Sequence, residues 1–330
     1  MEKPTLLQVK ELTKFFPLKK KSIFGKREYV HAVEKVSFEV LAGETLGIVG
    51  ESGSGKSTLA RTILALTPST EGEVYYKGEQ ITDFKLSSEK KRQLRSELQM
   101  IFQDPYASLN PKMTIGSAVA EGIMANKKAT TIREAKEMVR DLLSVVGLQP
   151  EVYDRYPHEF SGGQRQRIGI VRALAVKPKL LFCDESVSAL DVSVQAQILN
   201  LFNELKEQFK LTYVFIGHDL AVVRYISDRI LVMYLGKVME IVPYDRLDSE
   251  NNHPYTRALI SAIPEPSTEA RKNRILLEGD IPSPVNPPKG CRFCKRCFMA
   301  EQICSQKDPD LVRVGPDHYV ACHFAKEVSL

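Results

Sequence analysis

The stretch Gly50-Glu51-Ser52-Gly53-Ser54-Gly55-Lys56-Ser57-Thr58 decides the fold of this chain. It fits the pattern G-x-x-x-x-G-K-[ST], in which a glycine-rich loop turns its backbone N–H groups toward phosphate oxygens. In that pattern Lys56 gives positive charge to the β- and γ-phosphates, and the hydroxyl of Ser57 is a ligand for Mg²⁺. The helix behind such a loop adds the positive end of its dipole. The stretch therefore predicts a site for a nucleoside triphosphate.

The residues around this loop supply the context that the pattern requires. Residues 45–50 form a short apolar run that stops at glycine, as a buried parallel strand does. A helix is expected from about Lys56, and its apolar side is formed by Leu59, Ile63, Leu64 and Leu66. Residues 6–40 read as a layer of antiparallel strands, interrupted by Pro17 and a lysine-rich loop.

A second apolar run, residues 179–184, ends in Asp184 and is followed by Glu185. An aspartate at that position can hold Mg²⁺ through water, and the adjacent glutamate can orient or deprotonate the attacking water as a general base. Such a run is weak evidence alone and strong evidence downstream of a phosphate-binding loop. It predicts the catalytic half of a nucleotide site.

Between these two motifs the pattern is helical. Residues 133–146 place apolar side chains at helical spacing, and Gly147 is suited to end that helix. The α/β pattern then resumes with a helix at 194–209 and a buried strand at 212–217. We therefore expect an α/β protein with a helical insert at about residues 104–165.

Four further motifs complete a family pattern. They are Gln103 in Ile101-Phe102-Gln103-Asp104-Pro105, the segment Ser161-Gly162-Gly163-Gln164, the segment Ser188-Ala189-Leu190-Asp191, and His218 in Ile216-Gly217-His218-Asp219. With the phosphate loop and Asp184-Glu185, they make the chain resemble the ATP-binding subunit of an ABC transporter. The resemblance covers residues 6 to about 250. It implies a P-loop NTPase fold with an antiparallel β subdomain and a helical signature subdomain.

The resemblance also implies roles for these residues in ATP hydrolysis. Mg²⁺ is held by Ser57, Gln103 and Asp184. Glu185 polarises the attacking water, and His218 stabilises the γ-phosphate as it is transferred. The signature residues Ser161, Gly162, Gly163 and Gln164, with Asp191, serve the ATP held by a second, homologous ATPase subunit. Closure of that dimer drives two membrane permease subunits between two conformational states. A solute-binding protein is the indirect partner of this complex.

The aromatic residue that stacks on adenine has two candidates. Phe16 lies where the family usually has tyrosine or tryptophan, and we favour it. Tyr29 competes, because the loop between residues 17 and 28 is longer than usual. Stacking accepts any aromatic ring, so chemistry does not choose between them.

The C-terminal part, residues 251–330, is expected to be an irregular extension of the ATPase domain at 1–250. Its segments 253–259 and 279–284 resemble the C-terminal extension of oligopeptide and dipeptide importer ATPases. The long loop at 17–28 resembles the F-type partner of the two non-identical ATPases in such importers. Nickel importers share much of the extension, so an importer of nickel or another small solute is the alternative.

The extension holds five of the six cysteines, spaced C-x2-C-x2-C-x6-C-x17-C. Four thiolates suit Zn²⁺ or an iron–sulfur cluster. The family's usual four are matched by Cys291, Cys297, Cys304 and Cys322. Cys294 is an additional thiol, which either replaces Cys291 as a ligand or remains free. We favour a [4Fe–4S] cluster over zinc. Cys183 lies within a buried strand and is expected to be core packing.

The composition limits the remaining possibilities. The chain has 330 residues, with 43% hydrophobic and 26% charged residues and a net charge of +5, which does not resemble a nucleic-acid binder. No stretch approaches the ~20 apolar residues of a membrane span. We therefore expect a cytosolic protein bound to the inner face of the membrane through its permease. A soluble ABC ATPase that acts on nucleic acid or ribosomes is the less favoured alternative.

Overall fold

The computed structural model describes residues 3–19, 27–82, 86–104, 109–249, 252–263 and 274–326. The chain forms two compact units. Unit 1 is built mainly from residues 42–44 and 83–216, and unit 2 from residues 4–41, 45–82 and 217–330. Residues 20–26, which belong to the long loop singled out above, lie outside the described residues.

Unit 2 begins with the expected antiparallel sheet. Its strands run in the order β2-β1-β4-β5. Their bounds are Thr5–Pro17 for β1, Tyr29–Leu41 for β2, Glu71–Tyr76 for β4 and Glu79–Gln80 for β5. Leu7 and Val9 of β1 are buried and Gln8 between them is half-buried, which is a local period-two pattern. Further along the strand, where its pairing with β2 shifts register, Leu12, Thr13 and Lys14 are buried in succession.

The phosphate loop of unit 2 follows a buried parallel strand. β3 (Thr45–Val49) pairs in parallel with β9 (Arg229–Tyr234), and β9 continues as a hairpin into β10 (Lys237–Pro243). Tyr234 pairs with Lys237, so the hairpin turns on Leu235 and Gly236, which both have positive φ. These two residues form the two-residue turn of the hairpin.

The helix after the loop is shorter than its apolar pattern indicated. α1 spans Lys56–Ile63 and buries Leu59 and Ile63, but Leu66 lies beyond the helix and is 58% exposed. Ala65 takes the left-handed conformation with φ 52, which ends the helix before Leu66 can join its apolar face.

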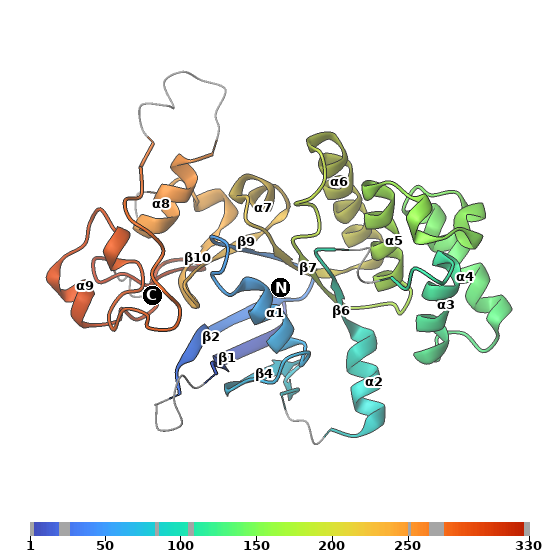
Figure 1. The fold of residues 1–330 in the computed structure, drawn as a ribbon, viewed down its shortest axis with the longest axis horizontal. Coiled ribbons are helices and arrows are strands. Elements are labelled where there is room, and N and C mark those ends of the chain that lie inside the picture. The colour runs from blue at the N-terminus through green and yellow to red at the C-terminus, as the bar shows by residue number, and fades with distance from the viewer. Residues whose placement is uncertain are drawn as a thin grey trace. The chain divides into compact units, whose positions relative to one another are not determined.

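Unit 1 contains a parallel sheet and a group of helices. β6 (Leu98–Ile101), β7 (Leu180–Asp184) and β8 (Thr212–Ile216) pair in parallel. The helices are α2 (Ser88–Glu97), α3 (Ile115–Ala125), α4 (Ile132–Val145), α5 (Gly162–Leu174) and α6 (Val192–Phe209), with 3-10 turns η1 (Pro150–Asp154) and η2 (Pro157–Glu159). α3 and α4 pack on each other and on α5, as Figure 1 shows, and form the predicted helical insert.

The C-terminal extension is more regular than expected, and its last strands lengthen a sheet of unit 2. β12 (His318–Val320) pairs antiparallel with β10, and β11 (Val312–Gly315) pairs with β12. The helices of this part of unit 2 are α7 (Leu220–Ile226), η3 (Tyr244–Arg246), α8 (Pro254–Ser261), η5 (Cys294–Arg296) and α9 (Gln302–Gln306). Periodicity misses strands as short as β11 and β12, because four and three residues are too few to show an alternating pattern.

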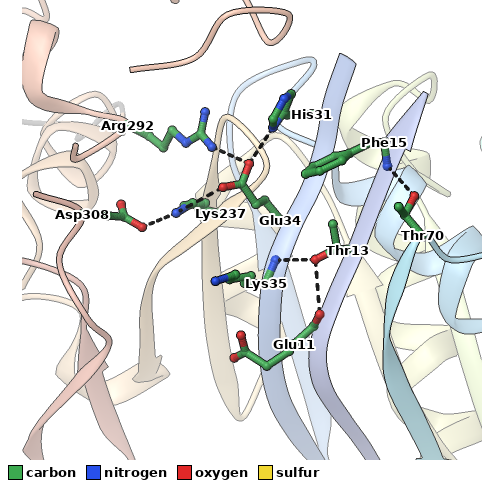
Figure 2. A network of polar contacts seen from close by, with 10 residues as sticks. All are labelled: Glu11, Thr13, Phe15, His31, Glu34, Lys35, Thr70, Lys237, Arg292 and Asp308. Atoms are coloured by element: carbon green, nitrogen blue, oxygen red, sulfur yellow. Dashed lines mark hydrogen bonds and ion pairs between the residues drawn. The ribbon is translucent and has the colours of Figure 1, made fainter. Parts of the chain in front are cut away.

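Polar contacts tie the extension to β2 (Figure 2). Glu34 accepts a hydrogen bond from Arg292 at 2.5 Å, forms an ion pair with Lys237 at 3.6 Å and contacts His31 at 2.7 Å. Lys237 in turn pairs with Asp308. Burial raises the pKa of Glu34, but His31, Arg292 and Lys237 together lower it below its ordinary value. The network therefore holds a charged carboxylate between the extension and the antiparallel sheet.

Candidate nucleotide site

The phosphate loop has the backbone conformation that glycine permits. Gly50, Gly53 and Gly55 all have positive φ, at 154°, 78° and 102°. A Cβ at Gly50 would lie 2.1 Å from the carbonyl oxygen of Met233, and one at Gly55 would lie 2.1 Å from that of Ala32. Only glycine fits at these two positions.

Lys56 is folded back into the loop. Its Nζ donates to the carbonyl oxygens of Gly50 at 2.7 Å and Glu51 at 3.1 Å, and to Ser54 Oγ at 3.3 Å. Ser52 and Gly53 are exposed at the tip of the loop, while Ser57 and Thr58 are half-buried at the start of α1. The loop thus surrounds its own ammonium group with oxygens and leaves its tip accessible to a phosphate chain.

His218 lies in the same unit as the loop. The backbone N–H of Gly217 donates to the carbonyl of Ile48 at 3.1 Å, which places His218 just beyond the carboxyl end of β3. Its side chain is exposed, and the next residue, Asp219, caps α7. Ligands of parallel α/β sheets bind at the carboxyl ends of strands, so this position suits the predicted γ-phosphate role.

Both candidates for the adenine platform lie where β1 ends and β2 begins. Phe16 pairs with Val30 and Pro17 with Tyr29. Phe16 is 38% exposed and Tyr29 is 42% exposed. The Nζ of Lys14 lies 4.8 Å from the centre of the Phe16 ring, so that ring already has a cation on one face. The choice between the two rings stays a prediction.

In unit 1 the structure brings two predicted catalytic residues together. The side-chain amide of Gln103 donates to Glu185 Oε2 at 2.7 Å. Glu185 has φ 46, and its N–H donates to the carbonyl of Ile216 at 3.0 Å, so the chain turns sharply after β7. Asp184 closes β7 and is 1% exposed. An amide, a buried carboxylate and a half-buried carboxylate therefore lie along one edge of the β6-β7-β8 sheet.

The signature residues form the start of α5. Ser161 caps the helix, because its Oγ accepts from the N–H of Gln164 and the Gln164 side chain accepts from the N–H of Ser161. Gly162 and Gly163 follow as the first helical residues. A Cβ at Gly163 would lie 2.6 Å from Val194 Cγ1. The predicted signature residues are therefore presented at a helix N-terminus, which attracts anions.

Asp191 caps the neighbouring helix α6. Its Oδ1 accepts from the N–H of Val194 at 3.0 Å and from Ser193 Oγ at 2.7 Å. The hydrogen bond from Val194, with that from Ser193, lowers the pKa of Asp191. The carboxylate is thus charged and exposed beside the signature segment.

The five cysteines of the extension lie close together without forming a ligand set. All are free thiols, and the N–H of Cys291 donates to the carbonyl of Cys304 at 2.8 Å. Burial raises the pKa of Cys291 to about 12, and it also raises the pKa of Cys294, Cys297 and Cys322. Among the described residues no group of three or more His, Cys, Asp or Glu side chains has a metal-binding arrangement. The sixth cysteine, Cys183, is fully buried in β7, as expected.

Two residues of the extension contact the phosphate loop, and sequence reasoning did not find them. Tyr255 and Arg296 both bind Glu51, across 204 and 245 residues. Tyr255 belongs to the segment 253–259 that marks the extension, and Arg296 lies between two cysteines. Neither pattern points to the phosphate loop.

Comparison with known proteins shows which family the chain belongs to. A model of the family "ABC transporter" matches residues 33–188, and a model of "Oligopeptide/dipeptide transporter, C-terminal region" matches residues 239–304. The oligopeptide transport ATP-binding protein AppF of Bacillus subtilis is 51% identical over 97% of each chain. The di/tripeptide transport ATP-binding protein DppF of Pseudomonas aeruginosa is 47% identical over 98% of each chain.

Solved structures share the fold. A dimeric ATP-binding cassette, bound to ADP and Pi in a post-hydrolysis state, has a TM-score of 0.63 and 29% identity, covering 72% of this chain and 99% of its own. The cbiO1 protein of Clostridium perfringens, part of an ABC transporter complex, has a TM-score of 0.63 and 25% identity, covering 76% of this chain and 92% of its own.

The fold and the phosphate loop define an ATPase of the P-loop class. The chain belongs to the ABC transporter family, whose ATP-binding subunits hydrolyse ATP to drive transport. Within the described part of the chain, no helix combines the length and the apolar character of a membrane span.

Proposed function

We propose that this chain is the ATP-hydrolysing subunit of an importer for oligopeptides or dipeptides. The observation that carries the proposal is similarity along nearly the whole chain to peptide-transport ATP-binding proteins, at 51% and 47% identity. The match to the oligopeptide/dipeptide transporter C-terminal region extends this similarity to a part of the chain outside the ATPase core.

The proposed chemistry follows the roles that the sequence assigns to these residues. The loop residues 50–58 bind the phosphates of ATP, and Lys56 exchanges its carbonyl partners for phosphate oxygens. Glu185 orients water for in-line attack, and Gln103 holds the carboxylate of Glu185 in place. His218 stabilises the charge that develops on the γ-phosphate. These steps need positioning and electrostatic stabilisation, without a covalent intermediate.

Mg²⁺ suits the oxygen donors that the sequence assigns to it. The hydroxyl of Ser57, the amide oxygen of Gln103 and the carboxylate of Asp184 are hard oxygen ligands. Asp184 is a buried carboxylate, and the amide nitrogen of Gln103 already points to Glu185, so the amide oxygen is the atom left for a cation. When bound, the ion would neutralise charge on the β- and γ-phosphates.

The signature residues are proposed to act on a second ATPase subunit. Ser161, Gly162, Gly163 and Gln164 would contact the γ-phosphate of the ATP held by that subunit, with Asp191 beside them. The N-terminus of α5 supports this role, because its free N–H groups favour an anion. We propose a non-identical subunit as the partner, with two permeases and a solute-binding protein completing an importer on the cytoplasmic face of the membrane.

Transport by the reconstituted complex tests the proposed function. The chain would be co-expressed with the permeases and the second ATPase of the proposed importer, and the complex placed in liposomes with its binding protein. ATP-dependent uptake of labelled di- and oligopeptides is expected. Uptake of nickel without peptide would support the alternative importer, and stimulation of the ATPase by RNA or DNA, with no membrane partner, would reject both.

The [4Fe–4S] cluster, with zinc as the alternative, also stays a proposal. Its support is the spacing of Cys291, Cys297, Cys304 and Cys322 and the family resemblance, together with the closeness of the thiols. The side chains in this structure do not form a ligand set, so no step of the mechanism runs through the cluster. Anaerobically purified protein should carry about four irons per chain. Stoichiometric zinc, or no metal, would reject the cluster.

A further inference from the structure

Glu51, the second residue of the phosphate loop, is held by two side chains from the C-terminal extension. Its backbone N–H donates to Tyr255 Oη at 3.0 Å. Its carboxylate accepts a hydrogen bond from Arg296 Nη1 at 2.7 Å. The ion pair is largely shielded from water, because Arg296 is 10% and Glu51 is 25% exposed.

The two partners are themselves fixed by a buried aromatic cluster. Tyr255 packs on Tyr234 at 4.9 Å and on Phe293 at 5.2 Å between ring centres, and all three rings are buried. Arg296 donates to Tyr234 Oη at 3.3 Å and lies 5.8 Å from the centre of that ring. A close-packed cluster of this kind leaves little freedom to the groups that it carries.

Holding Glu51 also sets the shape of the loop. The carbonyl oxygen of Glu51 accepts from Lys56 Nζ at 3.1 Å and from the N–H of Ser54 at 3.1 Å. Tyr255 therefore fixes one end of the same peptide segment that orients Lys56 and Ser54. A loop that is already in its binding shape loses less conformational entropy when phosphate arrives.

The charge of Glu51 gives Arg296 a second effect. Glu51 places a carboxylate in the loop that has to receive a polyanion, and an unpaired carboxylate there would repel the phosphates. The guanidinium of Arg296 neutralises that carboxylate at hydrogen-bonding distance. Removing Arg296 would leave Glu51 partly buried, unpaired and close to the incoming charge.

We propose that Tyr255 and Arg296 are positioning residues for nucleotide binding, through which the C-terminal extension sets the affinity of the phosphate loop for ATP. The inference rests on the proposed role of residues 50–58 as the phosphate loop. It gives the extension a task inside the ATPase cycle, carried by two named contacts to one loop residue.

ATP affinity of the full chain tests this inference. Arg296→Gln is expected to weaken ATP binding about fivefold or more, and Tyr255→Phe about threefold, because each removes one contact to Glu51. The double variant Glu51→Gln with Arg296→Gln should recover most of the lost affinity, since no unpaired carboxylate then faces the phosphates. A merely structural role of Arg296 predicts no such recovery.

Arg292→Gln is the matched control. Arg292 is also a buried arginine of the extension, but it pairs with Glu34 on β2 and does not contact the loop. Equal losses of affinity in Arg292→Gln and Arg296→Gln, or no recovery in the double variant, would overturn the inference. If Arg296→Gln does not fold, unchanged affinity in Tyr255→Phe overturns it instead.

The variant Lys56→Ala distinguishes the positioning role of Tyr255 and Arg296 from the assignment of residues 50–58 as the phosphate loop. Loss of ATP binding in Lys56→Ala with unchanged binding in the Arg296 and Tyr255 variants would reject only the positioning role. Unchanged binding in Lys56→Ala would reject the assignment of residues 50–58 as the phosphate loop.

Discussion

The side-chain amide of Gln103 donates a 2.7 Å hydrogen bond to the carboxylate of Glu185, across 82 residues of sequence. The two residues follow adjacent parallel strands, β6 and β7, whose carboxyl ends meet at one edge of the sheet. The bond ties the predicted catalytic carboxylate to the predicted Mg²⁺ ligand. A substitution at Glu185 that keeps the hydrogen bond from Gln103 can therefore test its catalytic role alone.

Glu185→Gln should abolish hydrolysis and keep ATP binding. The introduced amide can still accept the hydrogen bond from Gln103, so the local structure persists while the base is lost. We expect turnover to fall at least ~10²-fold, which is the lower range for a general base. Phosphate release measures turnover, and equilibrium binding of ATP measures affinity. Turnover at the normal rate would show that Glu185 is not the base.

Ser161→Ala should impair both hydrolysis and stability, and Ser161→Asp should impair hydrolysis alone. The alanine variant loses the N-cap of α5, at a cost of about 1 kcal/mol in unfolding free energy. Aspartate keeps a cap, but its charge opposes the γ-phosphate that this helix end is proposed to meet. ATP binding by the isolated monomer should be retained in both variants. Loss of binding by the monomer would contradict a role toward a second subunit's ATP.

Gly163→Ala should destabilise unit 1, whereas Gly162→Ala should not. A Cβ at Gly163 lies 2.6 Å from Val194 Cγ1, and the β-branched valine has little freedom to move. Overpacking of this kind costs about 1–3 kcal/mol. A Cβ at Gly162 meets Leu190 Cδ2 at 3.6 Å, an ordinary contact. Urea unfolding of both variants is the measurement, and equal midpoints would contradict the predicted clash.

The network around Glu34 should make the free energy of unfolding decrease as the pH falls into the acid range. Because the folded-state pKa of Glu34 lies below its ordinary value, its contribution is present above the unfolded-state pKa of about 4.3. That contribution is lost as the pH falls through the lower, folded-state pKa. We expect Glu34→Gln to be less stable than the parent at pH 7 and nearly equal to it near pH 3. A difference that stays constant across that range would exclude Glu34 as the titrating group.

Much of the nucleotide site could be predicted because its motifs are local. Gly50, Gly53 and Gly55 mark left-handed backbone, and the apolar run 180–184 ends at Asp184, so a strand-to-loop edge can be read from neighbouring residues. The end of α1 could not be read this way. Leu64 and Leu66 continue the apolar spacing, but the left-handed Ala65 ends the helix first.

The sequence alone determined the class of this protein, because a phosphate-binding loop, a strand ending in Asp-Glu and a signature helix cap are each built from consecutive residues. Tertiary structure decided what the C-terminal extension contacts. It added β12 to β10, paired the fully buried Glu240 with His318 at 2.6 Å, and joined Arg296 to Glu51. The physical reason is that buried polar groups need hydrogen-bond partners, and the partners here lie 78 and 245 residues away, where no local pattern reaches.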